Sequence, residues 1–173
     1  PSRQTGKMLA MLGATPVGMP LPGIPEAMSK GVIDGAVVPY EIAPSIKLDE
    51  LTKFVAETDR SQPAMCATIF AMTMNLAKYQ SLPPDLRAVI DRNSGLETSA
   101  MFGRTQGDAD VPARKKIVDA GVKINVIPAD ELNRWRKATD ALDDQWAAAI
   151  TAKGKDGKAL LQAARDLVKK HTK

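Results

Sequence analysis

The stretch from residue 13 to residue 41 constrains the fold most, because its apolar pattern changes character twice within a short distance. A β-prone run at residues 14–17 precedes residues 24–28, whose apolar positions follow one another at i, i+3 and i+4, as on one face of a helix. A second apolar run, residues 36–38, is typical of a strand and is closed by Pro39. The stretch therefore predicts strand, short helix and strand. The loops of such a unit meet at the sheet edge where α/β proteins usually place a ligand.

The remaining chain predicts more helix than strand. β-prone runs occur at residues 53–58, 64–74 and 122–127. From Asn75 onward we expect mostly helix, including a polar helix over residues 94–110 that Pro112 should break or kink.

The C-terminal part carries the clearest helical pattern. From Asp130 an apolar stripe repeats every three or four residues, which predicts one long helix that ends at Gly154. A final helix is expected after Gly157. The members of the stripe are Leu132, Trp135, Thr139, Leu142, Trp146 and Ile150.

The composition is that of an ordinary globular domain. The chain has 173 residues, of which 44% are hydrophobic and 25% charged, which is enough for one domain with a real core. No apolar run approaches the roughly 18 residues that a membrane span needs. The single cysteine, Cys66, excludes an intrachain disulfide and argues against a thiolate metal site, and we expect it to be buried.

Positive charge is concentrated in the second half of the chain. Residues 112–173 hold 14 Lys and Arg against 8 Asp and Glu, whereas residues 1–111 hold 10 against 12. The basic residues alternate with acidic ones at helical spacing, and no glycine-rich or aromatic binding motif accompanies them. The pattern favours solvated helix faces over a nucleic-acid surface.

The sequence has few residues and no motifs that are typical of catalytic sites. The sequence contains no HExxH, GxSxG, GxGxxG or P-loop motif, and its one histidine, His171, lies near the end, where we expect it to be solvated. The neighbouring carboxylates Asp143 and Asp144 would diverge by about 100° on a helix, so they cannot serve one substrate. We therefore expect no enzyme, no catalytic residues, no metal and no cofactor.

Several motifs point to one known family. The run L-G-A-x-P-V-x-M-P at residues 12–20 is followed by a short helix and by G-V-x-D-G at residues 31–35. Further on come A-M-T-M-N at residues 71–75, L-P-P-D-L at residues 82–86 and G-V-K at residues 121–123. This series resembles the solute-binding proteins of TRAP transporters, the tripartite carriers of organic acids. The resemblance covers nearly the whole chain but only about the second half of a typical member.

The resemblance implies a fold and a role. The fold would be the two-lobed, type II periplasmic-binding-protein-like α/β fold, of which this chain would cover most of the second lobe and the C-terminal helices. Residues 1–74 would form a ligand-binding lobe and hinge strand, and residues 75–173 a helical region with one strand near 122–127. The protein would capture an organic acid in the periplasm, after removal of a signal peptide, and deliver it to a TRAP membrane permease.

The resemblance also implies where ligand would bind. Two candidates, Met19 and Leu21, lie in the proline-rich corner. Others lie in the expected strand of residues 36–38 and in the residues that follow it. Phe70 could contact ligand from the hinge strand or simply pack in the core. The full set is Met19, Leu21, Ala36, Val37, Val38, Tyr40, Glu41 and Phe70. The family's carboxylate-clamping arginine would lie two residues upstream of Pro1. Arg3 is the nearest arginine, but it does not match the motif and is either a ligand contact or a solvated loop residue.

Two departures from the family pattern bear on the ligand. Residues 36–38 read Ala-Val-Val where many members have Gln-Glu-Asn, and Leu21 stands where many have Phe. Val38 can only pack, so a less polar or larger carboxylate, aromatic or keto-acid-like, fits better than a sugar acid or a C4 dicarboxylate. Tyr40 would hydrogen-bond or stack on the ligand, and Glu41 would pair with a ligand hydroxyl or a residue of the other lobe. Alternatively, these two residues merely begin the connection between lobes.

A different class of function stays open at this point. The chain could be an isolated structural or interaction piece without its own ligand site. The tryptophan-bearing stripe would then be an exposed apolar face that needs the N-terminal lobe or a second copy of the chain as its partner.

Overall fold

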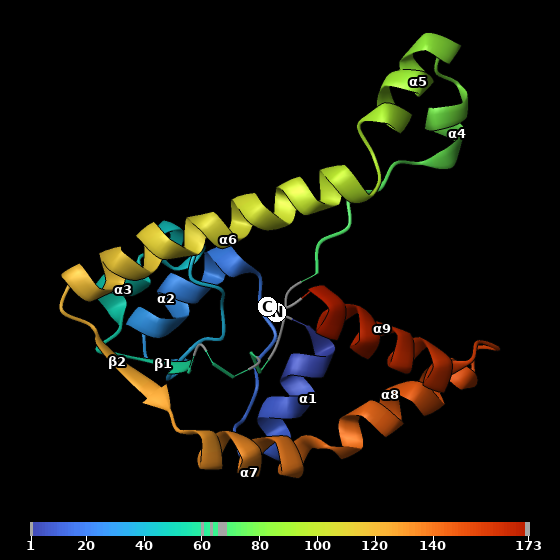
Figure 1. Cartoon of the computed structure of the whole chain (residues 1–173). Coiled ribbons are helices and arrows are strands. Elements are labelled where there is room, and N and C mark those ends of the chain that lie inside the picture. The colour runs from blue at the N-terminus through green and yellow to red at the C-terminus, as the bar shows by residue number, and fades with distance from the viewer. Residues whose placement is uncertain (1, 60, 63, 66–68, 172–173) are drawn as a thin grey trace. The chain divides into compact units, whose positions relative to one another are not determined.

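The computed structural model describes residues 2–59, 61–62, 64–65 and 69–171 (Figure 1). The chain forms two compact units. The first unit comprises Pro1–Gly18, Glu57–Cys66 and Val126–Lys173, and the second comprises Met19–Ala56 and Ala67–Asn125. Each unit draws on segments from both sides of residue 74, so the expected division at that residue stays a prediction.

Two short strands form the sheet. β1 (Phe54–Thr58) pairs with β2 (Lys123–Ile127) in a two-stranded sheet. Just before β1, the carbonyl of Lys53 accepts a hydrogen bond of 3.0 Å from the N–H of Lys123. Each strand begins in the second unit and ends in the first, so the two run parallel. Both strands were predicted from their β-prone sequences, and both are confirmed.

The second unit contains most of the short elements and the longest helix. They are η1 (Leu21–Gly23), α2 (Ile24–Ser29), η2 (Ala43–Ile46), α3 (Leu48–Leu51), α4 (Leu76–Gln80), α5 (Pro84–Arg92) and α6 (Leu96–Asp119). The helix predicted around residues 24–28 is therefore confirmed as α2. Gly31, just after it, has φ +66°, a left-handed conformation that costs glycine little.

The core of the second unit joins α2, η2, α3, α6 and β2. Its buried side chains are Ile24, Ala43, Ile46, Leu48, Ile117 and Val122. An ion pair of 3.1 Å between the buried carboxylate of Asp49 and Lys116 also links α3 to α6. Burial of apolar side chains from segments far apart in sequence is the main source of stability in this unit.

The first unit is helical. It contains α1 (Arg3–Met11), α7 (Ala129–Thr139), α8 (Ala141–Thr151) and α9 (Gly157–His171). Leu132 of α7 is fully buried. The N–H of Gly157 donates to the Thr151 hydroxyl, and Arg165 pairs with Asp143, so α8 and α9 are joined at two places. The final helix was predicted, and His171 at its end is exposed as expected.

Three predicted strands are wrong in the described residues. Residues 14–17, residues 36–38 and the described part of residues 64–74 lie outside any strand. β propensity alone does not make a strand, because the backbone also needs a neighbouring strand to bond with, and β1 and β2 pair with each other. Cys66, expected to be buried, lies outside the described residues.

Two helix boundaries also differ from expectation. Pro112 lies inside α6 and does not end it (Figure 1). Ala113 and Ile117 of α6 are buried, and this packing offsets the lost backbone hydrogen bond.

The single helix expected from Asp130 is instead two helices, α7 and α8, which meet at Asp140. The Thr139 hydroxyl donates to the carbonyls of Trp135 and Arg136, an arrangement that often bends a helix. The stripe still faces inward, because all six of its members are buried or half-buried.

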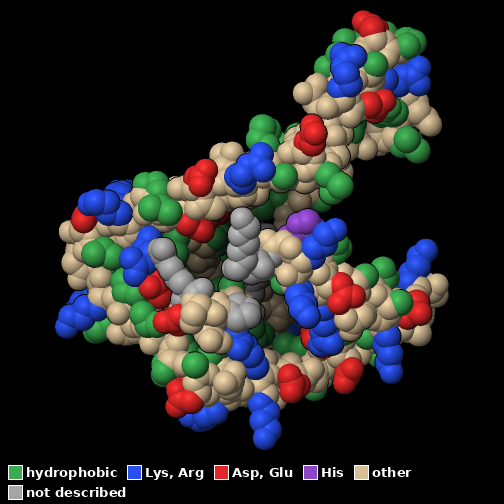
Figure 2. All heavy atoms as spheres, in the orientation of Figure 1, with side chains coloured by type: hydrophobic (Ala, Val, Ile, Leu, Met, Phe, Trp, Pro, Cys, Tyr) green, Lys and Arg blue, Asp and Glu red, His purple; other side chains and the backbone are tan. Residues whose placement is uncertain are grey.

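In the part of the chain that the structure describes, every helix is too short or too polar to cross a membrane. On the face shown in Figure 2, Lys and Arg side chains are intermixed with Asp and Glu along α6.

Candidate ligand-binding loop

The candidate residues near the start of the second unit lie on a proline-rich corner. Pro20 is extended, with φ −61° and ψ 141°, and η1 follows it with Pro22 in its first turn. Met19 is half-buried and packs against the core of the second unit. Leu21 is 37% exposed. The corner thus anchors one apolar side chain and leaves the next accessible to solvent.

The second candidate segment runs past the same core and then turns. Residues 36–39 have no regular secondary structure, and the N–H of Ala43 then donates to the carbonyl of Tyr40 at 3.0 Å. Val38 and Tyr40 pack against the core, whereas Val37 is 37% exposed. Met19, Val38 and Tyr40 therefore pack against the same core and have a structural role there.

Glu41 is held by α6. Its backbone N–H donates to Oδ1 of Asp110 at 3.0 Å, and its Oε1 accepts from Nε2 of Gln106 at 3.2 Å. Gln106 and Asp110 are four residues apart and so lie on one face of the helix. The sequence analysis did not single out either residue, because 65 and 69 positions separate them from Glu41.

The surroundings of Glu41 change its acidity. Burial raises the pKa of the Glu41 carboxyl above its usual 4.5, and the hydrogen bond with Asp110 and the charge of that carboxylate raise it further. The hydrogen bonds of its own backbone N–H and of Gln106 act in the opposite direction. Glu41 therefore keeps its proton to a higher pH than an isolated glutamate and can donate a hydrogen bond there.

Phe70, the last candidate, is largely exposed. Its side chain is 65% exposed, and the segment around it is without regular structure. Arg3, the first residue of α1, is also exposed and belongs to the first unit. The contact of either residue with a ligand stays a prediction.

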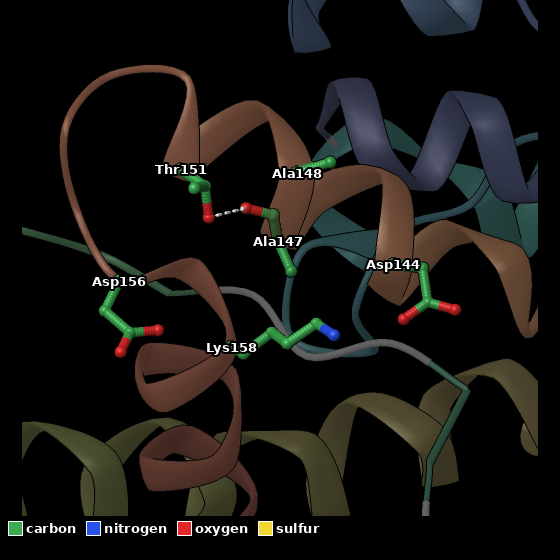
Figure 3. A pocket seen from close by; sticks show the side chains of 6 residues that line it. All are labelled: Asp144, Ala147, Ala148, Thr151, Asp156 and Lys158. Atoms are coloured by element: carbon green, nitrogen blue, oxygen red, sulfur yellow. Dashed lines mark hydrogen bonds between the residues drawn. The ribbon is translucent and has the colours of Figure 1, made fainter.

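A hollow of about 630 Å³ lies in the first unit between α8 and α9 (Figure 3). Four of its six lining residues are polar or charged, and none of the eight candidate residues contributes to it. The lining residues are Asp144, Ala147, Ala148, Thr151, Asp156 and Lys158. All eight candidates belong to the second unit, so this hollow is not the site that the sequence analysis proposed.

Metal binding has no support among the described residues 2–59, 61–62, 64–65 and 69–171. No group of three or more His, Cys, Asp or Glu side chains there could hold a metal ion.

Comparison with known proteins assigns the family. The family model described as "Bacterial extracellular solute-binding protein, family 7", or DctP, matches residues 1–149. The chain belongs to the DctP family. The proteins of this family are solute-binding proteins of transport rather than enzymes.

Solved structures share the fold of this DctP-family chain. A TRAP solute-binding protein from Rhodoferax ferrireducens, in complex with copurified benzoate, is 46% identical, with a TM-score of 0.94 over 99% of this chain and 53% of that one. A second structure is that of a marine metagenome TRAP solute-binding protein specific for aromatic acid ligands, in complex with metahydroxyphenylacetate. It is 41% identical, with a TM-score of 0.88 over 100% of this chain and 54% of that one.

A TRAP periplasmic solute-binding protein from Bordetella bronchiseptica, 23% identical with a TM-score of 0.78 over 96% of this chain and 52% of that one, supports the fold alone. The DctP-family chain therefore has the α/β fold of TRAP solute-binding proteins and spans about half the length of these relatives. The family and the fold expected from the sequence motifs are confirmed.

Proposed function

We propose that the protein is a periplasmic receptor that captures an aromatic carboxylate and delivers it to a TRAP membrane permease. The observation that carries the proposal is the apolar segment Ala36–Val37–Val38, which borders the Tyr40–Glu41 turn. Two structures more than 40% identical to this chain hold aromatic acids, namely benzoate and metahydroxyphenylacetate, which supports the same ligand class here.

The chemistry of the segment suits such a ligand. An aromatic acid has a flat apolar body and one carboxylate, so its site needs apolar walls and a small number of polar groups. Leu21 and Val37 are partly exposed apolar side chains of the same unit, and Tyr40 brings an aromatic ring with a hydroxyl group. In the proposed site Leu21 and Val37 line the ring of the ligand, and Tyr40 stacks on it or bonds to it.

The remaining candidates have supporting roles in this proposal. Met19 and Val38 hold the loops against the core, and Glu41 donates or accepts a hydrogen bond to a ligand hydroxyl. Ala36 leaves room beside Val37, and Phe70 adds an aromatic contact.

The test is native mass spectrometry with calorimetry on the purified full polypeptide that carries this sequence. Benzoate and metahydroxyphenylacetate are offered beside succinate and gluconate, a C4 dicarboxylate and a sugar acid. We expect the aromatic acids to bind in a 1:1 complex and the other two to bind far more weakly. Preference for succinate or gluconate would contradict the proposed ligand class.

Binding of no acid would contradict the receptor role itself. If the species observed were then the 18.5 kDa chain or a dimer of it, the alternative of a structural or interaction fragment would be supported.

A further inference from the structure

One face of α6 changes from apolar to polar toward the N-terminus of the helix. Ala113 and Ile117 are buried in the second unit, and the same face continues toward the helix N-terminus with Asp110 and Gln106, at spacings of three and four residues. Asp110 is half-buried and Gln106 is exposed. The apolar face that packs on the core thus becomes polar where it meets Glu41.

The two polar side chains bind different parts of Glu41. Asp110 accepts from the backbone N–H, which fixes the path of the chain, and Gln106 donates to the carboxyl group, which fixes the side chain. Because both bonds come from one rigid helix, backbone and side chain are oriented together.

The segment before Glu41 has no regular secondary structure of its own. Residues 36–39 lack regular secondary structure, so their path depends on the core contacts of Val38 and Tyr40 and on the anchoring of Glu41 at their end. A binding loop that is already ordered loses less freedom when ligand binds, and its affinity is correspondingly higher.

We propose that Gln106 and Asp110 are positioning residues that hold the Tyr40–Glu41 turn in the orientation that binds the aromatic acid. This inference rests on the proposed function, and it adds to the site two residues of α6 that need not touch the ligand themselves. Gln106 sets the direction of the Glu41 carboxyl group, and Asp110 sets the direction of the turn.

Four variants of the full polypeptide test the inference. Asp110→Ala removes the acceptor, and Asp110→Asn keeps an oxygen acceptor without the charge. Gln106→Ala removes the donor, and Asp108→Ala, at an exposed position of the same helix, is the matched control. Calorimetry with benzoate and with metahydroxyphenylacetate gives the dissociation constants, and hydrogen exchange of the peptide that contains the Glu41 amide reports on the turn itself without ligand.

We expect Asp110→Ala to weaken benzoate binding about tenfold, the effect of losing one hydrogen bond, and to speed exchange at Glu41. Asp110→Asn should restore both values to within about twofold of the unaltered protein, because the acceptor is present again. Gln106→Ala should weaken binding of metahydroxyphenylacetate, whose hydroxyl group Glu41 would bond, more than binding of benzoate, while leaving the Glu41 amide protected. Asp108→Ala should change neither value.

The outcomes separate the two proposals. If the unaltered protein binds neither benzoate nor metahydroxyphenylacetate, the proposed function is wrong and the positioning role is wrong with it. If the unaltered protein binds benzoate and Asp110→Ala binds it equally well, the positioning role alone is overturned. Equal losses in Asp110→Asn and Asp110→Ala would also overturn it, because the acceptor would then not be the property that matters.

Discussion

At the scale of single residues, Glu41 combines a fixed position with a changed acidity. Its N–H and its carboxyl group are both bonded to α6, and the carboxylate of Asp110 lies beside it. A carboxyl group placed in this way is stable in its protonated form, so its effect on the fold depends on pH.

The raised pKa of Glu41 predicts the direction of this pH dependence. The folded state holds the proton to a higher pH than the unfolded state does, whose pKa is near the usual 4.5. Stability therefore falls as the pH rises from that value through the folded-state pKa, and the loss is complete above it. We expect Glu41→Gln, which cannot ionise, to lack this loss, so its stability relative to the unaltered protein should increase over that window and then level off.

Urea unfolding from about pH 4 to about pH 8 measures the difference between the two proteins at each pH. Glu50→Gln, at an exposed glutamate, is the control. A difference between Glu41→Gln and the unaltered protein that is constant across the range would contradict the prediction.

Tyr40 allows a direct test of the ligand site. Because its hydroxyl is expected to bond to the ligand, or its ring to stack on it, Tyr40→Ala should weaken aromatic-acid binding by about 1 kcal/mol or more. Tyr40→Phe keeps the ring that packs on the core and separates the two contributions. Affinity that is unchanged in both variants, measured by calorimetry, would remove Tyr40 from the site.

At the scale of the elements, the α8–α9 hairpin depends on one glycine. A Cβ at Gly157 would overlap the carbonyl oxygen of Ala147, a backbone atom that cannot turn aside. Gly157→Ala should therefore force the two helices apart and cost about 1–3 kcal/mol of unfolding free energy. Gly107→Ala is the matched control inside α6, where a Cβ meets nothing within 4 Å, and should stabilise the protein by about 0.5–1 kcal/mol.

Thermal unfolding of both glycine variants measures these effects. If Gly157→Ala melted no lower than the unaltered protein, the close contact between α8 and α9 would not be important for stability.

Local signals predicted the elements well wherever the element needs no partner. α2 follows from the apolar spacing of residues 24–28, and α9 lies where a final helix was expected. The strands predicted at residues 36–38 and 69–74 are wrong. A strand forms only where a neighbouring strand is available for hydrogen bonding, and a local sequence pattern does not show whether one is. The helix break predicted at Pro112 is also wrong, because the buried side chains after it stabilise α6.

At the scale of the whole molecule, the sequence motifs predicted the family and the fold, and the family model and solved structures confirm both. The candidate site could be predicted only in part. Tyr40 and Glu41 were named from the resemblance to the family, whereas Gln106 and Asp110 lie on a helix whose polar residues resemble any solvated face. Their proposed role rests on contacts across 65 and 69 positions, which composition and periodicity do not reveal.

Because both strands run from the second unit into the first, the chain order of the segments affects when each unit can fold during synthesis. All segments of the second unit, Met19–Ala56 and Ala67–Asn125, leave the ribosome before Val126 does. The second unit can thus bury Ile117 and Val122 against α2 while translation continues. The first unit forms later, because α7, α8 and α9 are made after all segments of the second unit, and α1 stays without them until they have emerged.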